Sequence, residues 1–154
     1  VTIDQAMSRE TPFDPGETPL VIGAGIGGEL AVDYALRGLL PRLIDEEPVY
    51  RTVNYLGSRG PRVQAVLAKY GIKPEPGLKV LRIGDGEVEV ENADGQREVI
   101  TPSKVVLCAG RTPSIDLVAE LQGKGVVVQV IGDARKSRSY GNAIHEAAYL
   151  SRHI

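Results

Sequence analysis

Residues 19–30 read Pro19-Leu20-Val21-Ile22-Gly23-Ala24-Gly25-Ile26-Gly27-Gly28-Glu29-Leu30, and this stretch decides the fold. It has the pattern of a short buried strand, a glycine turn and the start of a helix. Gly23, Gly25 and Gly28 fill the spacing G-x-G-x-x-G. In that fingerprint the first glycine permits a sharp turn, the second lets the backbone approach a pyrophosphate, and the third lets helix and strand pack closely. The pyrophosphate would lie on the N–H groups of the helix start, which makes Ile26 a candidate contact as well.

The residues that follow strengthen this interpretation. Residues 30–37 have helical spacing and end at Gly38, and residues 41–45 predict the next strand after a short turn. Asp45 lies 22 residues after Gly23, where a dinucleotide-binding fold places the acid that accepts hydrogen bonds from the adenosine ribose. An alternative stays open, in which the glycines only shape a tight turn and Asp45 is a solvated strand end.

Charges near Asp45 bear on the choice of nucleotide. Glu46 and Glu47 add negative charge where a 2′-phosphate would lie, which favours NAD over NADP. Arg42 and Arg51 are near enough in sequence to leave NADP open.

The rest of the chain alternates strands and helices as an α/β domain does. Residues 1–18 predict an irregular polar lead-in, and residues 46–60 are ambiguous. The expected fold is Rossmann-like and three-layered, with a parallel sheet and an antiparallel meander. The remaining expected elements are a helix at 61–71, meander strands at 78–83, 87–92 and 96–100, a fully buried strand at 104–110, a strand at 126–131 and a helix at about 141–153.

Composition narrows the class of protein. A chain of 154 residues suits one domain with a sizeable core, and 42% apolar and 25% charged residues are ordinary for a globular protein. A net charge of −2 argues against nucleic-acid and anionic-membrane partners. Cys108, as the single cysteine, excludes an internal disulfide and fits a reducing, cytoplasmic compartment. The chain has neither a signal-peptide pattern nor an apolar run long enough for a membrane span, and its two histidines suggest no metal site.

The order of these motifs resembles the C-terminal part of the 2-enoate reductase, 2,4-dienoyl-CoA reductase and trimethylamine dehydrogenase family. Three stretches carry the resemblance: the glycine fingerprint with Asp45, residues 105–113 (Val-Val-Leu-Cys-Ala-Gly-Arg-Thr-Pro), and residues 130–134 (Val-Ile-Gly-Asp-Ala) with Arg138 and residues 143–147. One departure is that Glu29 directly follows Gly28, where the family has one residue in between.

The resemblance implies an organisation. Residues 1–125 correspond to the NAD(P)-binding domain, and residues 126–154 to the last strand and helix of a flavin- or nucleotide-binding domain whose other parts are missing. Asp133 would meet a flavin ribityl hydroxyl or the equivalent atom of ADP, and Gly110 and Arg138 would be further cofactor contacts. An alternative for Asp133 is a cap on the following helix. Cys108 and His145 are expected to be structural.

The resemblance also implies what this chain lacks. The family's first glycine fingerprint, which holds the flavin pyrophosphate, is absent, as is the N-terminal barrel with FMN and an iron–sulfur cluster. FAD, FMN and the cluster therefore belong only to a full-length parent, and the valine at position 1 is the start expected of an excised fragment. We expect no catalytic residue and no metal ligand here. The expected partners are a nucleotide and the missing flavin domain, and exposed apolar surface on residues 126–154 predicts self-association or a loosely held last helix.

Three functions follow as hypotheses. The favoured one is a nicotinamide-dinucleotide-binding module of a flavin-dependent oxidoreductase, inactive alone. The second is an ADP-binding structural module, for which trimethylamine dehydrogenase is the family precedent. The third is a stand-alone NAD-binding regulator.

Overall fold

The computed structural model describes residues 1–8, 12–48 and 59–153. The chain forms two compact units, Val1–Ala109 and Gly110–Ile154, each described here by itself. The first unit ends at Ala109, shortly after its last strand, which ends at Leu107. The assignment of residues 1–125 and 126–154 to two parent domains stays a prediction.

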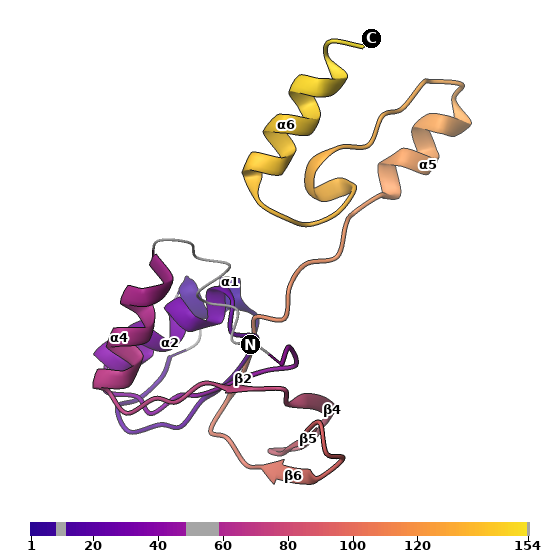
Figure 1. The fold of residues 1–154 in the computed structure, drawn as a ribbon. Helices are drawn as coiled ribbons and strands as arrows, with labels where there is room; N and C mark the ends of the chain where they lie inside the picture. Colours follow the sequence, from indigo (N-terminus) through magenta and orange to yellow (C-terminus); the bar gives the residue numbers. More distant parts are fainter. Residues whose placement is uncertain (9–11, 49–58, 154) are drawn as a thin grey trace. The chain divides into compact units, whose positions relative to one another are not determined.

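The first unit contains two sheets (Figure 1). Its four-stranded sheet has the order β3-β2-β1-β7, and all neighbouring pairs are parallel. The strands are β1 (Leu20–Ile22), β2 (Arg42–Asp45), β3 (Glu75–Pro76) and β7 (Val105–Leu107). The second sheet is an antiparallel meander of β4 (Lys79–Ile83), β5 (Val88–Glu91) and β6 (Arg97–Ile100). This arrangement confirms the predicted fold class.

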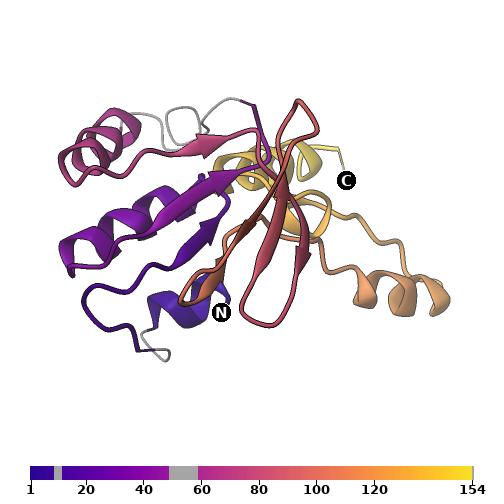
Figure 2. The ribbon, with the colours of Figure 1, turned by 90° about the horizontal axis from the view of Figure 1, so that it is seen from below.

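Side-chain alternation along the parallel strands builds three layers (Figure 2). Val21 and Leu43 pack on one face with the helices α1 (Ile3–Met7), α2 (Ile26–Leu36) and α4 (Gly60–Lys69). Leu20, Ile22 and Ile44 point to the opposite face. There they meet the inward side chains of the meander, which are Val88, Val90 and Ile100. The alternating burial of β5 confirms the prediction that one face of the meander is buried and the other is wet.

The expectation of an irregular lead-in over residues 1–18 is wrong at its start, because α1 forms there. Thr2 and Gln5 make a capping box, in which each side chain accepts a hydrogen bond from the other's backbone N–H. The Val1 ammonium donates to the Val105 carbonyl at 3.0 Å, and Ala6 is buried in the core. Tertiary contacts therefore hold a helix too short to be stable alone.

The prediction of a fully buried strand over residues 104–110 is also wrong. Only Val106 of β7 is buried, and 42% of Leu107 is exposed. The reason is position, since β7 stands at the end of the strand order beside β1. The core under the meander reaches Val105 but does not include Leu107.

The second unit consists of α5 (Asp116–Gly123), the 3₁₀ turn η2 (Gly132–Ala134) and α6 (Tyr140–Leu150). The predicted C-terminal helix is confirmed, and it begins with a capping box between Ser139 and Asn142. The strand predicted over residues 126–131 is wrong for this chain, because those residues have no strand assignment. A strand needs a hydrogen-bonded neighbour, and the described part of this unit contains no other strand to pair with.

Candidate functional site

The glycine loop lies between the carboxyl ends of three adjacent strands. The Gly23 N–H donates to the Ile44 carbonyl at 2.8 Å, and the Cys108 N–H donates to the Ile22 carbonyl at 2.8 Å. Gly23 has φ +102°, and a Cβ there would lie 2.5 Å from the Cys108 carbonyl oxygen. Only glycine combines that backbone conformation with so close an approach. The loop is thereby held at the edge of the sheet where doubly wound folds bind their ligands.

Close packing between helix and strand occurs at Gly27, a residue to which the sequence analysis assigned no role. A Cβ on Gly27 would lie 2.9 Å from Val21 Cγ1 and 3.2 Å from Cys108 Cβ. The interval from Gly23 to this glycine is one residue shorter than the fingerprint spacing assigned to Gly28. The sequence did contain a hint of this role, because Gly27 and Gly28 are adjacent and either of them can be the third glycine of the fingerprint. The cofactor-contact role of Gly28, itself buried, stays a prediction.

The start of α2 carries the other predicted loop contacts. Gly25 is the N-cap residue and Ile26 is the first residue of the helix, and both are half-buried. The N–H groups of a first helical turn have no partner within the helix, so they can donate to an anion.

Asp45 ends β2 directly beside the glycine loop. Its side chain is buried, with a relative exposure of 8% for the residue. Oδ2 accepts a hydrogen bond from the Ala24 N–H at 2.6 Å, and Oδ1 accepts one from the Glu47 N–H at 2.9 Å. Asp45 is therefore no solvated strand end. Each oxygen has a second lone pair, so the carboxylate can still accept from a hydroxyl group.

Arg42 lies at the opposite end of β2. Its guanidinium pairs with Glu75 at 2.7 Å and with Glu98 at 2.7 Å, and these hydrogen bonds raise the pKa of Arg42. Arg42 is thus engaged at the amino end of the strand, away from Asp45. Arg51, the other cation that left NADP open, lies outside the described residues.

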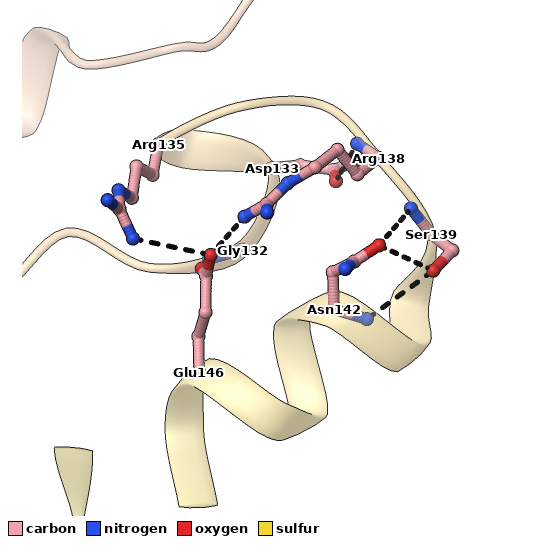
Figure 3. A network of polar contacts seen from close by, with 7 residues as sticks. All are labelled: Gly132, Asp133, Arg135, Arg138, Ser139, Asn142 and Glu146. Atoms are coloured by element: carbon pink, nitrogen blue, oxygen red, sulfur yellow. Dashed lines mark hydrogen bonds and ion pairs between the residues drawn. The ribbon is translucent and has the colours of Figure 1, made fainter. Parts of the chain in front are cut away.

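In the second unit, Asp133 and Arg138 lie in the turn before α6 (Figure 3). Asp133 Oδ1 accepts from the backbone N–H of Arg138 at 3.3 Å, and Oδ2 lies 3.8 Å from the Arg111 guanidinium. The Asp133 side chain is 51% exposed. It does not cap α6, because Ser139 does. Gly110, the first residue of this unit, has φ +99° and open space around it.

The residue that organises this turn is Glu146, which sequence analysis quoted only as part of a family motif. Its side chain is 17% exposed. Oε2 accepts from the Gly132 N–H at 2.8 Å, and Oε1 accepts from the guanidinium groups of Arg135, at 3.4 Å, and Arg138. The Gly132 hydrogen bond, followed by the Arg138 hydrogen bond, lowers the pKa of Glu146. The spacing of 14 residues between Gly132 and Glu146 carries no local signal.

The remaining expectations concern buried and metal-binding groups. Cys108 is buried, as predicted, and burial raises the pKa of its thiol to about 12. His145 is exposed on α6. Residues 1–8, 12–48 and 59–153 contain no cluster of histidine, cysteine and carboxylate groups that could hold a metal ion. Within the same residues, no helix is long and apolar enough to cross a membrane.

The parallel sheet, its helices and the antiparallel meander define the class of fold, which is the three-layer α/β fold of dinucleotide-binding domains. No family model matches the chain. The chain is 29% identical to bilirubin reductase of Mediterraneibacter gnavus over 91% of its length, and 33% identical to NADH oxidase of Thermoanaerobacter brockii over 83%. Histamine dehydrogenase from Rhizobium sp. 4-9 matches 92% of the chain with a TM-score of 0.76 and 25% identity. A 2-naphthoyl-CoA reductase matches 94% with a TM-score of 0.74 and, at 20% identity, supports the fold alone.

These comparisons confirm the family resemblance: the chain is similar to one segment of the 2-enoate reductase and trimethylamine dehydrogenase-like flavin oxidoreductases. It spans only 22% and 20% of the two curated relatives and 24% of histamine dehydrogenase. By their names these relatives are a reductase, an oxidase and a dehydrogenase, and the chain corresponds to a part of each.

Proposed function

We propose that this chain is the nicotinamide-dinucleotide-binding module of a larger flavin-dependent oxidoreductase and is inactive alone. The observation that carries the proposal is the 2.6 Å hydrogen bond from the Ala24 N–H to Asp45 Oδ2. It joins the glycine loop after β1 to the acid that ends β2, at the carboxyl ends of two neighbouring parallel strands. That junction is where a doubly wound fold holds pyrophosphate and ribose.

The residues present fit the ADP half of such a ligand. The N–H groups of the first turn of α2, from Ile26 onward, would donate to the pyrophosphate, and Gly25 leaves room for it to approach. Asp45 would accept from the ribose hydroxyls with the lone pairs that its two backbone donors leave free. When bound, the nicotinamide supplies a hydride to a flavin. This chain's own residues bind and orient the carrier, so none is assigned as catalytic.

The charges around β2 support NAD over NADP. Glu46 and Glu47 are exposed directly after Asp45, and their charge opposes a 2′-phosphate. Arg42 is committed to Glu75 and Glu98 at the other end of the strand.

The contacts of the second unit support a role in a larger protein. Asp133 is half exposed and lies in the turn that resembles a flavin motif, with Arg138 beside it. Together with Gly110 they would meet a flavin or ADP held mainly by a further domain of the larger protein. The relatives are about four times as long as the chain, which leaves room for that domain.

An ADP-binding structural module is the second candidate, because Gly23, Gly25 and Asp45 all address the ADP half. Calorimetric titration of the 154-residue chain with NADH, NADPH and ADP distinguishes the nicotinamide-dinucleotide-binding module from the ADP-binding structural module. We expect NADH to bind more tightly than NADPH. Equal affinity for NADH and ADP would favour the structural module, and tighter NADPH binding would contradict the charge argument.

Gly25→Val places a side chain where the pyrophosphate would approach. It should weaken NADH binding by about 1–3 kcal/mol through steric exclusion and unmade hydrogen bonds, with the circular dichroism spectrum retained. Gly16→Ala, at an exposed turn with open space around it, is the matched control and should bind as the parent does. Unchanged binding in Gly25→Val would place the nucleotide elsewhere.

A further inference from the structure

The polar network before α6 converges on one carboxylate (Figure 3). Glu146 accepts from the backbone of Gly132, the residue before Asp133, and from the side chain of Arg138, five residues after it. The backbone N–H of the same Arg138 donates to Asp133 Oδ1. Both ends of the turn that carries Asp133 are therefore tied to Glu146.

Packing around Gly132 makes this tie specific. Gly132 has φ +61°, and a Cβ on it would lie 3.1 Å from Ala143 Cβ, one turn before Glu146 on α6. The backbone of the turn thus lies directly on the helix. Because a carboxylate bond to a backbone N–H has a fixed direction, the Gly132 peptide cannot rotate without losing it.

We propose that Glu146 is a positioning residue for Asp133: as an anion it holds Gly132 and Arg138 so that the Asp133 carboxylate faces solvent in one orientation, ready to accept from a ligand hydroxyl. The ligand part of this role rests on the proposed function of Asp133. The effect on the turn does not, because it requires no ligand.

The charges around Glu146 determine how the turn between Gly132 and Arg138 responds to pH. Arg135 and Arg138 face Glu146 from the turn, and Asp133 pairs with Arg111. The hydrogen bond from the Gly132 N–H, followed by the one from Arg138, holds the pKa of Glu146 below its ordinary value, so the residue is an anion at neutral pH. As the pH falls through that depressed pKa, protonation removes the charge that holds Arg138, and Asp133 is released.

The test follows backbone amides of the 154-residue protein by NMR. In the parent, the Gly132 amide should exchange about tenfold to a hundredfold more slowly than in Glu146→Ala, as expected for a hydrogen bond to a charged acceptor. On acidification, the Gly132 and Arg138 amide signals should move together. In Glu146→Gln the side-chain carbonyl can still accept from Gly132, but the amide group cannot accept from both arginines. Gly132 should then keep part of its protection and lose its acid transition.

Two references make the outcome decisive. The Asn142 amide, which donates to Ser139 Oγ, reports whether α6 still begins where it should. Glu120→Gln, which removes a charge paired with Lys124 on exposed α5, should leave Gly132 and Arg138 unchanged. If Gly132 exchanges equally fast in the parent and Glu146→Ala while Asn142 is intact, the positioning role is overturned. If the Asn142 amide also loses its protection in Glu146→Ala, the helix start is disturbed and Glu146→Gln becomes the deciding variant. An acid transition of the Gly132 amide that survives in Glu146→Gln would overturn the positioning role. If NADH does not bind but the amide-exchange results are as expected, the proposed function is wrong and the role of Glu146 in holding the turn is retained.

Discussion

The two compact units differ in the burial of their apolar side chains. In the first unit, helices cover one face of the parallel sheet and the meander covers the other, so that both faces are buried. In the second unit, none of the described residues of α5 and α6 is buried. Its large apolar side chains are instead exposed, namely Ile115, Leu117, Val126, Val127, Tyr140, Ile144 and Tyr149.

This difference shows what each unit depends on for its shape. A domain needs at least two packed layers around a core, and the first unit has three. Among its described residues the second unit has helices but no strand, and its turn before α6 is held by hydrogen bonds and ion pairs at Glu146. The exposed apolar residues fit the proposal that a further domain of a longer protein covers them.

The largest expected effect comes from removing one buried leucine. Leu43 is fully buried between the sheet and α2, whereas Leu117 on α5 is 61% exposed. Leu43→Ala should lower the free energy of unfolding of the first unit by about 2–5 kcal/mol, because it leaves a cavity in a packed core. Leu117→Ala should change the free energy of unfolding of the second unit by no more than about 0.5 kcal/mol. Urea unfolding followed by circular dichroism measures both, and similar losses would show that the units are not packed so differently.

The next largest effect is expected at Gly23, where a substitution tests whether the close packing of the first unit extends to its glycine loop. Gly23→Ala forces a Cβ against the Cys108 carbonyl at a positive φ, and should cost about 3 kcal/mol or more. Gly16→Ala has a similar φ of +88° but open space around it, so it should cost only the backbone strain of about 1–2 kcal/mol. The same urea experiment gives the difference. Equal costs would mean that the loop can move away from β7.

The smallest expected effect concerns the ion pair that joins the two sheets. The Arg42 hydrogen bond lowers the pKa of Glu98, so the pair stabilises the folded state above the ordinary pKa of glutamate. That contribution is lost as the pH falls through the depressed value. Arg42→Gln should lower the free energy of unfolding by less than about 1 kcal/mol at pH 7, because Glu98 is half exposed. At pH 3 the difference from the parent should be smaller.

The control for this experiment is Lys124→Gln, which breaks an exposed pair with Glu120 in the second unit. It should leave the unfolding of the first unit unchanged at both pH values. A gap between parent and Arg42→Gln that widens in acid would contradict the assigned sign.

Features with a local cause were predictable. The glycine turn at Gly23, the alternation of Val88 and Val90 and the helix from Pro61 depend on backbone conformation and side-chain periodicity within a few residues. The same local signals gave wrong predictions where the presence or absence of a neighbouring strand determined the structure. Residues 104–110 read as a buried strand but lie at an edge, and residues 126–131 read as a strand but have no partner.

The candidate site divides in the same way. Sequence spacing alone was enough to select Gly23, Gly25 and Asp45, because turn chemistry and strand length limit where such residues can lie along the chain. Only the tertiary structure decided that Asp45 bonds to the loop, that Gly27 carries the close helix–strand contact, and that Glu146 holds the turn at Gly132. Those contacts depend on which strands and helices become neighbours in space, and a hydrogen bond across 14 or 21 residues leaves no periodic trace in the sequence.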